Sequence, residues 1–129
     1  MKIIDLLKLI TKDLNYYSKS NKSLKINNFL FSLQFLLIFT YRLSHYLKTE
    51  KKLNRFRFLI RYINYLQHSK TSCQINSNAI IGNQIKFPHP TGIVIGKGVI
   101  IENNVSIYQN VTIGGKGNPI GYPKIERPQ

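Results

Sequence analysis

A histidine between two prolines is the side chain in this sequence best suited to chemistry. His89 lies in the segment Phe87-Pro88-His89-Pro90-Thr91-Gly92, where each proline fixes its own backbone φ angle and so stiffens the chain on either side of the imidazole. An imidazole ordinarily has a pKa of about 6.5, so it can accept and return a proton near neutral pH. A lone histidine is more often structural, so the case for a general base depends on where the fold places His89.

A glycine-rich run, residues 114–123, is the second segment with functional potential. It contains four glycines and two prolines, which is typical of an extruded loop, and such loops often wall active sites. No predicted helix follows to contribute N-terminal amides, so the glycines are a weak candidate for a phosphate-binding loop. A plain surface loop is the alternative.

Both segments interrupt a repeat in which an apolar residue returns at every sixth position. The repeat slips by two residues once, around His89. Its positions are Ile75, Ile81, Phe87, Ile95, Ile101, Ile107 and Ile113. A period of six predicts a parallel β-helix with about 18 residues per coil, in which each inward residue stacks on its counterpart one coil later. We expect the second position of each hexad, often Gly, to turn the corner with a positive φ.

The composition divides the chain into two parts. All eight glycines and all five prolines lie at or after Gly82. We therefore predict an α+β fold, with an α-helical domain over residues 1–71 and a short β-helix of two to three coils over residues 72–129.

Three helices are predicted in the amino-terminal part. The first carries an apolar stripe at helical spacing, made of Ile3, Leu7, Ile10 and Leu14. The second extends from Phe29 to about Lys48 with Asn28 as its cap, and the third starts near Asn54 and reaches about His68. The apolar stretch 29–39 is too short to span a bilayer, which needs about 20 residues. We interpret it as a buried helix, with docking on a partner subunit or on a membrane interface as alternatives.

The charge and the single cysteine indicate which partners and which cellular compartment suit the protein. The net charge is +14 and lies mostly in residues 1–70, which favours anionic partners, although AT-rich coding explains much of it. No nucleic-acid-binding motif accompanies the charge. Cys73 has no partner for an internal disulfide and no neighbouring His or acid for catalysis, which indicates a reducing, cytoplasmic setting, with the inner membrane face as an alternative. His45 and His68 have no metal-ligand spacing, so we expect structural roles and no metal site.

Four blocks of the sequence resemble the hexapeptide-repeat acyltransferases, and more closely their serine acetyltransferase branch, which has relatives that acetylate polysaccharide sugars. The helix segment 41–47 is also similar to the helix before the β-helix in that branch. The four blocks are residues 89–96, 101–107, 111–115 and 122–125.

The resemblance implies a left-handed β-helix, acetyl-CoA as acetyl donor, and homotrimers or higher assemblies with active sites between subunits. His89 matches the catalytic histidine of the family, which takes a proton from the acceptor hydroxyl. Gly114 and Gly115 fall in the cofactor-binding region, where a backbone amide near Gly115 would stabilise the oxyanion. Relatives continue for several more coils, so a truncated, inactive relative or an assembly module is the alternative reading.

Four positions depart from the family pattern at the orienting and acceptor-binding sites. Gln74 and Pro88 replace aspartates, and Gly121 and Tyr122 replace an Arg-His pair. The loss of these charges removes partners for the ammonium and carboxylate groups of free serine. An amide at Gln74 can still accept a hydrogen bond from the imidazole. The acceptor is therefore predicted to be a hydroxyl of either L-serine or a surface glycan.

Overall fold

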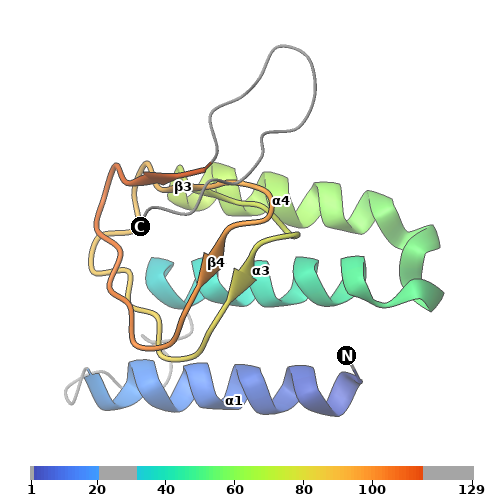
Figure 1. The fold of residues 1–129 in the computed structure, drawn as a ribbon, viewed down its shortest axis with the longest axis horizontal. Helices are drawn as coiled ribbons and strands as arrows, with labels where there is room; N and C mark the ends of the chain where they lie inside the picture. The colour runs from blue at the N-terminus through green and yellow to red at the C-terminus, as the bar shows by residue number, and fades with distance from the viewer. Residues whose placement is uncertain (1, 21–31, 115–129) are drawn as a thin grey trace.

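The computed structural model describes residues 2–20 and 32–114 of the chain (Figure 1). Helix α1 (Ile3–Ser20), helix α3 (Leu33–Thr49), the 3-10 helix η1 (Lys51–Phe56) and helix α4 (Arg57–Thr71) come first. Helix α3 lies between α1 and α4 (Figure 1). Five two-residue strands follow, so the predicted order of helices and then parallel coils is confirmed. They are β1 (Gln74–Ile75), β2 (Ile80–Ile81), β3 (Val94–Ile95), β4 (Ile100–Ile101) and β5 (Thr112–Ile113).

The strands pair in parallel between successive coils, as the hexad repeat predicts. Strands β1, β3 and β5 form one sheet, and β2 and β4 form another. Gln74 pairs with Val94 twenty residues later, whereas Val94 pairs with Thr112 eighteen residues later. Because Lys86 still pairs with Ser106 at the longer spacing, the two extra residues lie between Phe87 and Ile93. The slip predicted around His89 is thus confirmed as a local insertion in the first coil.

The inward hexad residues form the core of the coils. One hydrophobic cluster combines these residues with side chains from α1 and α3, so the helices and the coils share a core. The buried inward residues are Ile75, Ile81, Phe87, Ile95, Ile101 and Ile107. Cys73, at the junction between α4 and β1, is fully buried in the same cluster.

The coil corners differ from the prediction. Positive φ angles occur at the fourth position of a hexad rather than at the second, and the residues concerned are Gln84, Gly98, Asn104 and Asn110. Glycine at the second position serves close approach instead. A Cβ on Gly82 would lie 2.6 Å from the Asn103 Oδ1 atom and 2.8 Å from the carbonyl carbon of Glu102 in the next coil. The corner therefore needs Gly82 because the neighbouring coil fills the space of a side chain.

The helices also depart from the prediction at their faces and starts. In α1, Ile3 and Leu7 are exposed, and the buried residues are Leu6, Asp13 and Tyr17. The predicted stripe is confirmed at Ile10 and Leu14, which pack against the core, and wrong at Ile3 and Leu7. Apolar spacing also omitted Asp13, which is buried in an ion pair with Arg42. Helix α3 begins at Leu33 with Ser32 as its cap, later than the predicted start at Phe29, and the predicted cap Asn28 lies outside the described residues.

Helix α4 begins at Arg57, after the 3-10 turn that contains Asn54, and ends at Thr71. None of the helices within residues 2–20 and 32–114 is long and apolar enough to cross a membrane.

Side chains of α1 and α3 cover the backbone edge of the first coil that faces the helices, which we call the first-coil edge (residues 75–88). In a parallel coil these backbone groups have no preceding strand to pair with, and exposed strand edges are a liability. Five helix side chains bind six of its carbonyl oxygens. The pairs are His45 to Ser77, Tyr41 to Ala79, Arg42 to Ile81 and Gly82, Tyr17 to Ile85, and Gln34 to Pro88. The Gln67 Oε1 atom of α4 accepts the Ile75 N–H at 2.8 Å.

Because Tyr17 and Tyr41, which bind the first-coil edge, are buried, we expect the protein to lose stability in alkali. Burial raises the pKa of both the Tyr17 and the Tyr41 phenol above the ordinary value of 10.0. The unfolded chain therefore loses these protons first, so stability present below pH 10 falls as the pH rises above it, by about 1 kcal/mol per pH unit for each phenol.

Urea unfolding at pH 9, 10 and 11 measures this slope. Tyr17→Phe should reduce it, whereas Tyr62→Phe, which changes an exposed phenol, should not. Equal slopes in Tyr17→Phe and the wild type would contradict the prediction.

Candidate active site

His89 lies on the two-residue insertion that distinguishes the first coil from the second. Its side chain is exposed, between the fully buried Phe87 and the buried Pro90. The two extra residues take the chain out of the regular hexad register at this point, so His89 does not occupy a position that the other coils repeat.

Hydrogen bonds hold the backbone on both sides of His89. The carbonyl oxygen of Pro88 accepts a bond from the Gln34 Nε2 atom at 3.0 Å, and the carbonyl oxygen of His89 accepts one from the Thr91 N–H at 2.8 Å. Gly92, with a φ of 65°, returns the chain to the coil and donates its N–H to the Ser72 carbonyl oxygen. The peptide groups before and after the imidazole are both fixed, while the ring itself remains exposed.

The imidazole of His89 makes no hydrogen bond to any residue within the described ranges. Either ring nitrogen is therefore open to a substrate hydroxyl, and a general base needs one nitrogen within reach of the proton that it removes. Its predicted orienting residue, Gln74, is exposed on β1 and lines a cleft of about 250 Å³ together with Asn64, Gln67 and Asn76 of α4 and the first coil. No hydrogen bond joins Gln74 to His89 in the described part of the chain.

The predicted cofactor-binding and acceptor-binding residues are only partly described. Gly114 follows β5 directly. A Cβ added to Gly96 in the preceding coil would lie 3.3 Å from the Gly114 Cα atom. Gly115, Gly121 and Tyr122 lie outside the described residues, as does most of the glycine-rich run 114–123. Pro88 is half-buried next to His89, and its carbonyl oxygen is engaged by Gln34.

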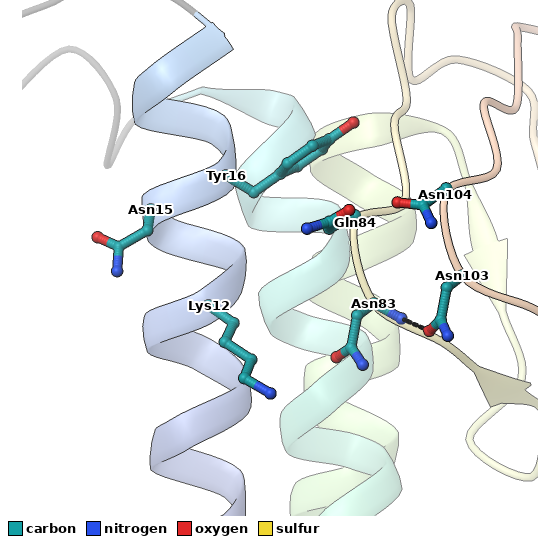
Figure 2. Close-up of a pocket in the computed structure, with 7 residues that line it drawn as sticks. All are labelled: Lys12, Asn15, Tyr16, Asn83, Gln84, Asn103 and Asn104. Carbon is teal, nitrogen blue, oxygen red and sulfur yellow. Dashed lines mark hydrogen bonds between the residues drawn. The ribbon is translucent and has the colours of Figure 1, made fainter.

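A larger cleft of about 460 Å³ lies between α1 and the corners of the two coils (Figure 2). Lys12 and Tyr16 of α1 face a group of amide side chains, whereas Asn15 points away from them in Figure 2. The amides are Asn83, Gln84, Asn103 and Asn104. Those at positions 83 and 103 join the coils, because the Asn103 Oδ1 atom accepts the Asn83 N–H at 2.7 Å. The described residues that line this cleft carry amide, phenol and ammonium groups, whereas His89 lies elsewhere, on the insertion of the first coil.

The structure also identifies a residue that the sequence analysis passed over. Gln34 interrupts the apolar stretch of α3, and a polar side chain within an otherwise apolar helix was the available signal. No group of three His, Cys, Asp or Glu side chains that could bind a metal ion occurs within residues 2–20 and 32–114.

Comparisons with known proteins place this geometry in a family. The chain is 38% identical over 120 residues to a serine acetyltransferase of Buchnera aphidicola subsp. Schizaphis graminum (strain Sg), covering 92% of this chain and 44% of that protein. A solved truncated serine acetyltransferase apoenzyme matches with a TM-score of 0.73 at 32% identity, covering 91% of this chain and 48% of the other. A serine acetyltransferase in complex with CoA matches with a TM-score of 0.70 at 30% identity, covering 85% and 46%. No family model matches.

A helical segment followed by parallel hexad-repeat coils, together with these similarities, places the chain in the class of hexapeptide-repeat acyltransferases. The similarities extend over most of this chain but over less than half the length of these relatives. Within the class, the chain belongs to the serine acetyltransferase family.

Proposed function

We propose that the chain is part of an acetyl-CoA-dependent O-acetyltransferase in which His89 is the general base. The observation that carries this proposal is the exposed His89 imidazole on the insertion of the first coil, where a hydrogen bond from Gln34 holds the preceding peptide group. It matches the histidine that catalyses acetyl transfer in the family that the sequence resembles, and one relative is solved in complex with CoA. The coils are proposed to be left-handed, as in that family.

The proposed reaction needs one residue that accepts and returns a proton. A nitrogen of the His89 imidazole removes the proton from the acceptor hydroxyl, and the hydroxyl oxygen attacks the carbonyl carbon of the thioester. The carbon–sulfur bond then breaks, and the imidazolium returns the proton to the leaving CoA thiolate. No covalent acyl-enzyme is required, and a backbone amide near Gly115 is proposed to stabilise the oxyanion.

L-Serine is the first candidate acceptor, because the relatives are named serine acetyltransferases. A sugar hydroxyl is the second, on the chemistry of the site. Gln74 and Pro88 carry no negative charge, so neither can pair with the ammonium group of a free amino acid. Gly121 and Tyr122 likewise provide no cation for its carboxylate. A sugar hydroxyl needs neither partner.

Release of CoA thiol from acetyl-CoA tests the proposal and the acceptor together. The 129-residue chain is assayed with L-serine, with an acidic oligosaccharide and with no acceptor. Release that depends on one acceptor identifies the substrate class. No release with either acceptor, together with no CoA binding, would favour the alternative, an inactive relative or an assembly module.

The active unit is proposed to be a homotrimer or a higher assembly. Ile80 and Ile100 pair between β2 and β4 and both point outward, with 57% and 66% of their surfaces exposed. Stacked apolar residues on an outer face of the coils fit contact with a second copy of the chain. The assembly would cover this face and set active sites between subunits.

Ile100→Lys is expected to dissociate this assembly into monomers. A charged side chain opposite Ile80 would have to be buried without a partner in the subunit contact. Light scattering after size-exclusion chromatography measures the mass, with Tyr108→Lys as a control at another exposed apolar position. A wild-type monomer at micromolar concentration, or an unchanged oligomer in Ile100→Lys, would overturn the assignment of this face.

A further inference from the structure

We infer that Gln34 of α3 is a positioning residue for His89, acting through the Pro88 carbonyl group. This inference rests on the proposed function of His89 and adds a residue to it from the helical part of the chain. The Gln34 Nε2 atom donates to the Pro88 carbonyl oxygen at 3.0 Å across 54 residues of sequence.

The bonded carbonyl belongs to the peptide group that leads into His89. Pro88 has no N–H, so its carbonyl is the only backbone group through which residue 88 can be held by a hydrogen bond. Fixing the plane of this peptide group limits the φ angle of His89, and that angle sets the direction of the bond from Cα to the imidazole. The Thr91 N–H fixes the following peptide group in the same way.

Gln34 is itself held firmly at the start of α3. It is the second residue of the helix and directly precedes Phe35, whose buried ring anchors this turn in the core. The Ser32 side chain adds stability to the helix end by accepting the Phe35 N–H at 3.2 Å, and this bond involves neither Gln34 nor Pro88. Phe35 is buried and its ring stacks on Phe39 with centroids 5.7 Å apart. On the other side of the bond, Phe87 is fully buried in the same hydrophobic cluster. The hydrogen bond therefore joins two anchored segments, and this is what allows it to set the position of the loop.

Positioning and stability can be separated by three substitutions at two positions, Gln34 and Ser32, at the start of α3. Gln34→Glu keeps the shape of the side chain but replaces the donor by a carboxylate, which at neutral pH only accepts hydrogen bonds. It adds the first acidic residue to a first turn that has none, which favours the helix through its dipole. Ser32→Ala removes the cap and leaves the donor to Pro88 in place. Gln34→Met removes the donor without adding charge.

The Gln34 variants are expected to lose activity, and Ser32→Ala is expected to lose stability instead. Gln34→Glu and Gln34→Met should lower kcat for acetyl transfer by about 10- to 100-fold, because small displacements of a catalytic group are costly. The KM for acetyl-CoA should stay within about twofold. Ser32→Ala should lower the thermal midpoint while kcat changes by less than about twofold.

A second readout does not depend on activity. The Hε1 resonance of His89, assigned by its loss in His89→Ala, should move or broaden at fixed pH in both Gln34 variants and remain unchanged in Ser32→Ala. Unchanged kcat and an unchanged resonance in the Gln34 variants would overturn the inference. If the wild type transfers acetyl to no acceptor, the proposed function fails, and the resonance alone then decides whether Gln34 positions the imidazole.

Discussion

His89→Ala is expected to lower acetyl transfer by about 10²- to 10⁴-fold, the range that a positioned general base contributes. The imidazole is exposed and makes no hydrogen bond within the described ranges, so its removal should leave the fold intact. Thiol release from acetyl-CoA under saturating acceptor measures the rate, and circular dichroism with thermal unfolding checks the structure.

The matched control for this substitution is His68→Ala. His68 is also an exposed histidine, but it lies in the last turn of α4. It should keep wild-type activity. A rate for His89→Ala within tenfold of the wild type would exclude His89 as the base.

Arg42→Met is expected to cost about 3–5 kcal/mol of unfolding free energy, the range for breaking a buried ion pair by removing one partner. The Arg42 side chain is 5% exposed, and its Nε atom lies 3.0 Å from the Asp13 Oδ2 atom. The same guanidinium donates to the carbonyl oxygens of Ile81 and Gly82. Its loss would leave a carboxylate and two carbonyl groups buried without a donor.

The pH dependence of this variant provides a specific check. Burial raises the pKa of the Asp13 carboxyl, and Arg42 opposes that shift. Without Arg42 the folded chain holds the Asp13 proton more tightly than the unfolded chain does. Ionisation therefore costs more stability as the pH rises, and Arg42→Met should be less impaired at pH 5 than at pH 7.

Urea unfolding of three variants and the wild type separates the contributions. Asp13→Leu combined with Arg42→Met should recover part of the loss, because no unpaired charge is then buried. Arg61→Met, at an exposed arginine of α4, should change stability by less than about 0.5 kcal/mol. A loss below about 1 kcal/mol for Arg42→Met alone would show that the first-coil edge does not depend on this side chain.

The coils could be predicted from the sequence because their pattern is one-dimensional. An aliphatic residue at every sixth position requires only that each coil stack on the next, and the slip at His89 is visible as a change of frame. The burial of Ile75, Ile81, Ile95 and Ile101 follows directly from that pattern. Strand pairings and the position of the insertion were therefore within reach of the sequence.

The helix side chains that bind the first-coil edge could not be predicted from the sequence, because they are polar and lie far in sequence from the carbonyl groups that they meet. A helix face predicted from apolar spacing omits Asp13, Gln34 and Arg42, although each is directed at the coil or at its partner. Their hydrogen bonds span 29 to 54 residues, and no local pattern specifies which carbonyl each will meet. What could be noticed is that polar residues interrupt an apolar helix without forming a polar face of their own.

Because the helices hold the first-coil edge, the stack of coils is expected to change in length only at its opposite end. Coils added or removed on the far side of β5 leave every contact between the helices and the first coil unchanged. A coil inserted before β1 would have to reproduce six carbonyl positions for five helix side chains. Changes in repeat number during evolution, and any engineered lengthening of the coil stack, are therefore expected on the carboxyl-terminal side, while the join between helix and coil is inherited as a unit.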